Sequence, residues 1–174
     1  MADRATSVTV RQAHPDDAMA MAAVIVQSWR ETYRGLMRDE VLDAPDLLER
    51  RERFWAAALT DPRYSDNRAL VAVRDGEIIG VAMSGPPLEP ESPWSRQLFL
   101  IYMLAAHHGS GAGPALLDSV IDPDDVVGLW VAEANPRAQA FYRRHGFRRT
   151  GDPKVDDGVR VICMTRDPRL TIGA

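Results

Sequence analysis

The chain has 174 residues, of which 45% are hydrophobic and 26% charged, as is typical of one soluble domain with its own core. Its 21 basic and 25 acidic residues give a formal net charge of −4, which argues against a nucleic-acid partner because such partners require a basic face. No apolar run reaches the roughly 18 residues of a membrane span, so we expect no membrane segment. The N-terminus lacks an apolar signal core and the lone cysteine cannot form an internal disulfide, so we expect a cytoplasmic protein.

The first third of the chain predicts one strand and two helices. Apolar and polar residues alternate over 7–13, which predicts a strand. Asp16 or Asp17 can then accept from the first free amides of a helix predicted over 18–34. A second helical stripe, capped by Asp46, ends before residue 61. The Ala44-Pro45 break divides this region into two helical pieces.

A hairpin and a long loop follow. Asp75-Gly76 stands between β-rich runs over 69–73 and 78–85, and such a dipeptide predicts a tight antiparallel turn. Residues 86–97 contain four prolines, so they are expected to form a loop rather than a central strand or a helix.

The stretch 98–120, LFLIYMLAAHHGSGAGPALLDSV, passes from an apolar strand through a glycine cluster into a helical pattern. Gly109, Gly111 and Gly113 alternate with small residues, and Pro114 stands where we expect the first helical residue. Free amides at a helix start and the helix dipole together form an anion site; the alternative is a plain tight turn. The spacing fits neither a GxxxxGK[ST] phosphate loop nor a GxGxxG dinucleotide fingerprint.

The last third predicts a strand, a helix and two more strands. The apolar run VVGLWV, 126–131, predicts a buried strand, and Asn135-Pro136 begins a helix that ends near Gly146. Two strands, FRRTG and VRVICMTR, are expected to be joined by the turn residues 152–158. The order of elements predicts a mixed sheet covered by helices.

Two motifs resemble those of the GCN5-related N-acetyltransferase (GNAT) family. The [QR]-x-x-G-x-[GA] motif reads HGSGAG at 108–113, with histidine in place of arginine or glutamine. The N-x-x-A-x-x-F-Y-x-x-x-G-F segment is matched by Asn135, Ala138, Phe141, Tyr142, Gly146 and Phe147. The resemblance covers about 8–166 of a single domain, 1–174. It implies an α/β (α+β) fold in which a mixed, mostly antiparallel sheet of about seven strands is flanked by about four helices.

The resemblance also implies acetyl-CoA as the acetyl donor, and no metal. The amides of 108–114 would bind the pyrophosphate, and a splayed fourth strand would pair with the pantetheine arm. The Leu104 N–H would stabilise the oxyanion, and the Asn135 side chain would contact the arm, although it can equally be a helix cap. The residues expected to contact the donor are Tyr102, Met103, Leu104, His108, Gly109, Ser110, Gly111, Ala112, Gly113, Pro114, Asn135, Ala138, Phe141 and Tyr142.

By the same resemblance Tyr142 is the general acid; without the motif, Phe141 and Tyr142 would be only an aromatic helix patch. Gln97 stands where relatives often have a glutamate base, so Glu133 is the nearest acidic candidate, acting through water, or else a structural carboxylate. Trp29 and Tyr33 are expected on the acceptor side, with a core position as the alternative for Trp29.

The sequence thus predicts an N-acetyltransferase that transfers acetyl directly, in a ternary complex, to a primary amine of a small molecule or peptide. The alternatives are a non-catalytic acyl-CoA-binding or regulatory protein of the same fold, and an interaction domain whose glycine loop is structural. We further expect protonation of His107 or His108 to strengthen cofactor binding at mildly acidic pH; the alternative is that both are surface histidines. Homodimers are common among relatives, but nothing in this sequence demonstrates one.

Overall fold

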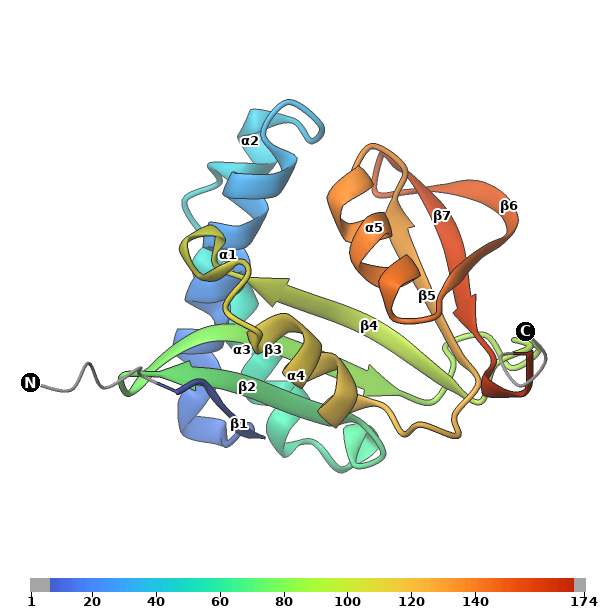
Figure 1. Ribbon diagram of the computed structural model, residues 1–174. Helices are drawn as coiled ribbons and strands as arrows, with labels where there is room; N and C mark the ends of the chain where they lie inside the picture. The colour runs from blue at the N-terminus through green and yellow to red at the C-terminus, as the bar shows by residue number, and fades with distance from the viewer. Residues whose placement is uncertain (1–6, 171–174) are drawn as a thin grey trace, which may run out of the picture.

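The computed structural model describes residues 7–170, and its seven strands form one sheet in the order β1-β2-β3-β4-β5-β7-β6 (Figure 1). Only β4 and β5 are parallel, and every other neighbouring pair within this range is antiparallel. The predicted mixed, mostly antiparallel sheet is confirmed. The strands are β1 (Thr9–Gln12), β2 (Arg68–Arg74), β3 (Glu77–Gly85), β4 (Arg96–Met103), β5 (Val127–Ala132), β6 (Arg148–Asp156) and β7 (Val159–Arg166).

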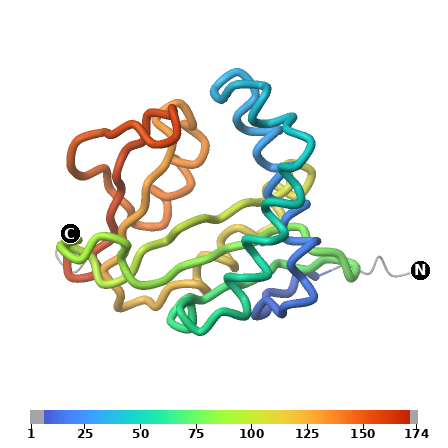
Figure 2. The backbone as a smooth tube through the Cα atoms, turned by 180° about the vertical axis from the view of Figure 1, so that it is seen from behind, coloured from blue at the N-terminus to red at the C-terminus, as the bar shows by residue number. Residues whose placement is uncertain are grey.

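Helices cover both faces of the sheet. Helices α1 and α3 lie on one face, which is turned toward the viewer in Figure 2, and α4 and α5 lie on the other. No helix within 7–170 is both long and apolar enough to cross a bilayer. The four longer helices match the expected number, and the predicted break near Pro45 separates off the single turn α2. The bounds are α1 (Ala18–Tyr33), α2 (Asp39–Leu42), α3 (Leu47–Thr60), α4 (Ala112–Val120) and α5 (Pro136–Arg144).

Each face of the sheet has its own apolar cluster. Trp55 of α3 and Met21 of α1, both fully buried, pack against Val81 of β3. On the opposite face, Leu116 of α4 packs against the neighbouring position, Ala82. Successive strand residues point to opposite faces, so β3 contributes to both clusters. Burying one such large side chain contributes about 1.5–3 kcal/mol, which holds both helical layers against the sheet.

The helix caps differ from the expected ones. The Asp17 carboxylate accepts from the backbone N–H of His14 at 2.8 Å and from Arg11 at 2.7 Å, rather than from the first amides of α1. Asp46 does occupy the N-cap position of α3, but its carboxylate pairs with Arg50 at 3.2 Å. In both cases the carboxylate oxygens bind a nearby arginine or an upstream amide instead of the first amides of the helix.

The first predicted hairpin is confirmed and the second is tighter than expected. Asp75 and Gly76 have φ of 54° and 83°, as a two-residue hairpin turn requires. Residues 152–158 were expected to be a turn, but β6 continues to Asp156 and the turn is Asp157-Gly158. Pro153 is tolerated inside β6 because β6 is an edge strand and its register shifts beside this proline.

Candidate active site

Strands β4 and β5 separate partway along their length. They pair only at 96–98 of β4 with 127–129 of β5, although β4 continues to Met103 and β5 to Ala132. A register irregularity at Met83/Ser84 of β3 leaves Phe99 of β4 outside the antiparallel register. From Phe99 onward, the edge of β4 that faces β5 therefore has no strand partner among residues 7–170, as the family resemblance implied.

The closed end of this splay is fixed by the proline-rich loop. The Gln97 side chain accepts from the backbone N–H of Leu88 at 3.2 Å, and Trp94 covers Gly128, where an added Cβ would lie 2.1 Å from the indole. Gln97 is thus a buried anchor for the loop, which agrees with its being unable to act as a base.

The register decides which backbone groups face the opening. The Leu104 N–H donates to the Ile79 carbonyl at 3.0 Å, so the expectation that it is the free donor is wrong. In an antiparallel pair, residues two apart direct their N–H and C=O groups the same way. The backbone N–H and C=O groups of Tyr102 therefore point toward β3, as those of Leu104 do. The backbone groups of Ile101 and Met103 point toward the open edge. The family resemblance indicated this segment, but it did not show which of its residues direct their backbone groups toward the open edge.

The glycine loop joins β4 to α4 and leaves alternate amides free. The N–H groups of His108 and Ser110 donate to carbonyls of the preceding turn, at 3.1 and 3.3 Å. Within residues 7–170, those of Gly109, Gly111 and Gly113 have no hydrogen-bond acceptor. The set of free amides is thus narrower than the predicted run from 108 to 114. Three alternating amides remain available for an anion.

Backbone conformation explains two of the glycines. Gly109 and Gly111 have φ of 81° and 85°, and no atom lies within 4 Å of a Cβ added at either position. It is conformation, therefore, and not lack of space that requires glycine there. Helix α4 begins at Ala112, so Pro114 is its third residue and not its first as predicted. The proline still falls in the first turn, where an N–H has no intrahelical partner.

The two sequence motifs meet in space. A Cβ on Gly113 would lie 3.5 Å from the Phe141 ring, so the start of α4 lies against α5. The Asn135 side chain accepts from the Ala138 N–H at 3.0 Å, which caps α5 and leaves its NH₂ group for another partner. The cap and the arm contact are therefore compatible.

Arg137, a positive charge that the sequence analysis did not single out, lies close to His108 of the glycine loop. His108 is exposed, and its Nε2–H donates to the Met103 carbonyl at 3.1 Å. Partial burial and the nearby Arg137 lower the pKa of His108 below its usual 6.5. Arg137 is the second residue of α5 and therefore lies near the loop. Its place inside the matched Asn135–Ala138 segment was the available signal.

Three tyrosines from three elements meet near the open edge. Tyr142 of α5 is 7% exposed, and its ring packs edge-on against Phe141 and Phe147. Burial, and secondarily the proximity of Tyr33, raise the pKa of Tyr142 above its usual range. Burial likewise raises the pKa of Tyr102, with further contributions from Tyr33. Tyr33 of α1 therefore lies within electrostatic reach of both Tyr102 and Tyr142.

Glu133 does not join this cluster. Its carboxylate pairs with Arg160 of β7 and with Arg149 of β6, at 2.5 and 3.3 Å. Strands β7 and β6 lie on the side of β5 opposite to β4. These two ion pairs favour the alternative for Glu133, a structural carboxylate, over the expected role as a base.

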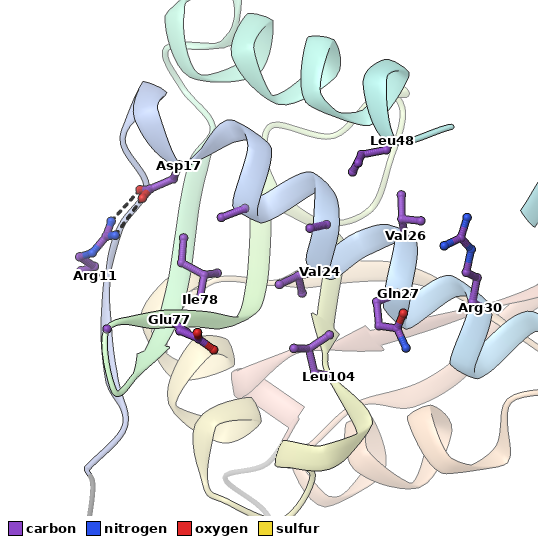
Figure 3. Close-up of a pocket in the computed structure, with 13 residues that line it drawn as sticks. Arg11, Asp17, Val24, Val26, Gln27, Arg30, Leu48, Glu77, Ile78 and Leu104 are labelled. Carbon is purple, nitrogen blue, oxygen red and sulfur yellow. Dashed lines mark hydrogen bonds and ion pairs between the residues drawn. The ribbon is translucent and has the colours of Figure 1, made fainter. Parts of the chain in front are cut away.

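Two cavities lie on the α1 face of the sheet. The larger, about 700 Å³, is an open groove along α1 beside Arg11, Asp17 and Leu104 (Figure 3). It contains neither Tyr142 nor the glycine loop, so its size does not make it the reaction site. The smaller, about 170 Å³, lies between α1, α3 and β4, and Tyr102 lines it. Trp29 lines it as well, and Arg51 stacks on the Trp29 ring.

Residues 49–168 match the family model described as an acetyltransferase (GNAT) domain. YuaI of Bacillus subtilis (strain 168), named an uncharacterized N-acetyltransferase, is 27% identical over 160 residues, 88% of each chain. Rv2775 of Mycobacterium tuberculosis, named a probable N-acetyltransferase, is 28% identical over 164 residues, 90% of each chain. The PaiA N-acetyltransferase of Thermoplasma acidophilum, solved with coenzyme A, has the same fold, with a TM-score of 0.71 at 18% identity over 92% of this chain and 99% of that chain. Because the family model spans more than half of a chain that also has the splayed strands and the glycine loop, this protein belongs to the GNAT family of acetyl-CoA-dependent N-acetyltransferases.

Proposed function

We propose that this enzyme transfers acetyl directly from acetyl-CoA to a primary amine of a small molecule, with both substrates bound at the β4–β5 splay. The observation that carries the proposal is the convergence of an unpaired β4 edge, free glycine amides and Tyr142. The 170 Å³ cavity beside Tyr102 supports a small acceptor.

The residues present fit coenzyme A. The free N–H groups of Gly109, Gly111 and Gly113 suit a pyrophosphate at a helix start, and Arg137 adds a permanent positive charge. The backbone of Ile101 and Met103 offers an open strand edge to the amides of the pantetheine arm, as in strand addition. When bound, acetyl-CoA supplies a reactive acetyl thioester.

The Met103 N–H is our candidate for the oxyanion donor. It faces the opening by the alternation that commits Leu104 to β3, and a strand backbone holds it rigidly. A preorganised donor of this kind contributes about 10²–10³ to the rate because it needs no reorientation as charge develops. The Met103 carbonyl, which accepts from His108, lies on the same edge.

Tyr142 is our candidate for the general acid. Its raised pKa keeps the phenol protonated at neutral pH, so it has a proton to give to the departing thiolate. A thiol has an ordinary pKa of about 8.5, below that of a phenol, so this transfer requires a nearby positive charge. The attacking amine becomes cationic as it forms the new C–N bond and supplies that charge. As the C–S bond breaks, Tyr142 protonates the thiolate, and the extra proton on the nitrogen passes to the Tyr142 oxygen, which restores the phenol.

The amine itself must arrive neutral. Glu133 is ion-paired on the far side of β5, and the neighbours that raise the pKa values of Tyr102 and Tyr142 are tyrosines, not carboxylates. We propose that the acceptor loses its proton to water before attack. For amines of one series, kcat/KM should then rise with pH up to the pKa of each amine.

The proposal is tested by following thiol release from acetyl-CoA across an amine library, together with the melting temperature in the presence of CoA. Release that depends on the amine, with stabilisation by CoA, supports the enzyme. Stabilisation without turnover of any amine supports the alternative, an acyl-CoA-binding regulatory protein. If CoA leaves the melting temperature unchanged, the glycine loop is structural.

A further inference from the structure

The smaller cavity has a lining suited to a ligand. It lies between β4 and the helices α1 and α3. These two helices are on the side of the sheet that faces the viewer in Figure 2. Apolar and aromatic side chains form its walls, with a single arginine among them. The lining residues are Ile25, Trp29, Arg51, Phe54, Trp55, Phe99, Leu100 and Tyr102.

Two hydrogen-bond donors in this lining have no acceptor. They are the indole N–H of Trp55 and the Nε–H of Arg51, both buried and without a partner among residues 7–170, whereas the Trp29 indole has the Tyr102 hydroxyl as a neighbour. Trp55 is completely buried. Buried polar groups are normally paired because an unpaired donor carries its full desolvation cost. Two such donors in the lining of one cavity favour a ligand that brings an acceptor.

Arg51 also carries a charge that its neighbours do not balance. Its guanidinium lies 4.9 Å from the Trp29 ring centroid and 5.9 Å from that of Phe54. Within the described part of the chain it has no ion pair. On the same helix, Arg53 pairs with Glu49 at 2.8 Å. A guanidinium held between aromatic rings beside a cavity is oriented to bind an anion.

We infer that this cavity binds a carboxylate of the acceptor, so that the substrate class is small amines that also carry a carboxylate. The inference rests on the proposed function. Donors without matching acceptors select a group rich in lone pairs, and the cationic Arg51 selects its negative charge. A cavity of about 170 Å³ admits a carboxylate with a short or aromatic stem, because one water occupies about 30 Å³.

Tyr102 links this cavity to the reaction site. Its side chain lines the cavity, while its pKa responds to Tyr33 and Tyr142. A carboxylate held at Arg51 therefore leaves the other end of the acceptor directed toward the tyrosines. The two ends of one small molecule would then meet an anion subsite and the acetyl-transfer site.

The first test compares matched acceptors in the thiol-release assay: 4-(aminomethyl)benzoate against benzylamine, and 4-aminobutanoate against butylamine. We expect a KM at least tenfold lower for the carboxylate member of each pair. Arg51→Gln should abolish this preference. Arg51→Lys should keep part of it, because lysine carries the positive charge but cannot form the two parallel hydrogen bonds of a guanidinium. Arg53→Gln, on the same helix but outside the cavity, should keep the preference. An equal loss for both members of a pair in Arg51→Gln would overturn the inference.

A binding test separates this inference from the proposed function. We expect sodium benzoate to raise the melting temperature of the parent and of Arg53→Gln by at least 2 °C, but not that of Arg51→Gln. Benzoate stabilisation without acetylation of any amine supports the cavity and contradicts the proposed function. Acetylation with no carboxylate preference supports the function and overturns the inference, as does the absence of any benzoate effect, which means that water alone satisfies the donors. If Arg51→Gln does not fold, Arg51→Lys provides the comparison.

Discussion

The two sides of the splay are built from different chemical groups. On the donor side the available groups are backbone amides, those of Gly109, Gly111 and Gly113 together with the edge of β4. On the proposed acceptor side they are side chains, above all Arg51 with two tryptophans that line the smaller cavity. Backbone donors require only the right φ and register, so they survive side-chain changes such as histidine at 108. Binding on the acceptor side depends on the identity of each side chain. Substitutions there can therefore change the amine substrate while acetyl-CoA binding is retained.

Tyr142 is the proposed general acid, and its loss should have the largest effect. In Tyr142→Phe we expect kcat to fall by about 10²-fold or more, because the general acid is removed while the ring packing against Phe141 and Phe147 stays. Stabilisation by CoA should be retained. Steady-state kinetics and thermal melts measure the two effects. A kcat within threefold of the parent would assign the proton transfer to another group.

The donor side should be sensitive to backbone conformation. In Gly111→Ala the positive φ costs about 1–2 kcal/mol, which corresponds to about a 5- to 30-fold rise in the KM for acetyl-CoA if the loop relaxes. The KM for the amine should stay unchanged. Gly158→Ala is the control, since it has a similar φ in the β6–β7 turn and should lower stability alone. Equal effects of both variants on KM would contradict a specific role for the loop.

The charge at Arg137 should have a moderate effect that depends on salt. Arg137→Gln is expected to raise the KM for acetyl-CoA about three- to tenfold at low ionic strength, and less at 0.5 M salt, because exposed charges are screened. Arg144→Gln, at the other end of α5, should change little. A salt-independent effect would mean that Arg137 acts through structure and not through charge.

His108 should give the smallest effect. Burial and Arg137 lower its pKa, whereas Glu31 and the bond to the Met103 carbonyl oppose this. Its contribution to stability without ligand is therefore full above pH 6.5 and is lost as pH falls through the lowered pKa. The affinity for acetyl-CoA should change in the opposite sense, strengthening by about threefold at most near pH 5 because only the cation attracts the pyrophosphate.

Melting temperatures without ligand and Kd values for acetyl-CoA, measured from pH 5 to 8, test this for the parent and His108→Gln. Identical pH profiles for the two proteins would remove His108 from cofactor binding. A parent that loses affinity on acidification would reverse the expected sign.

The sequence by itself determined the features that depend on neighbouring residues. Asp75-Gly76 specifies a two-residue hairpin, and glycines at 109 and 111 permit the left-handed turns before α4. Helix periodicity and strand alternation predicted the order of elements, and two short motifs indicated the family. These signals lie within a few residues of the structure that they determine, so no distant contact is needed to read them.

Only the tertiary structure decided which groups face each other. The register with β3 commits the Leu104 amide and releases that of Met103, and the arginines of β6 and β7 take up Glu133. Arg51 is one of three arginines between residues 50 and 53, and nothing local distinguishes it as the one beside the cavity. Such choices depend on partners that are distant in the sequence, and packing, not local conformation, brings those partners together.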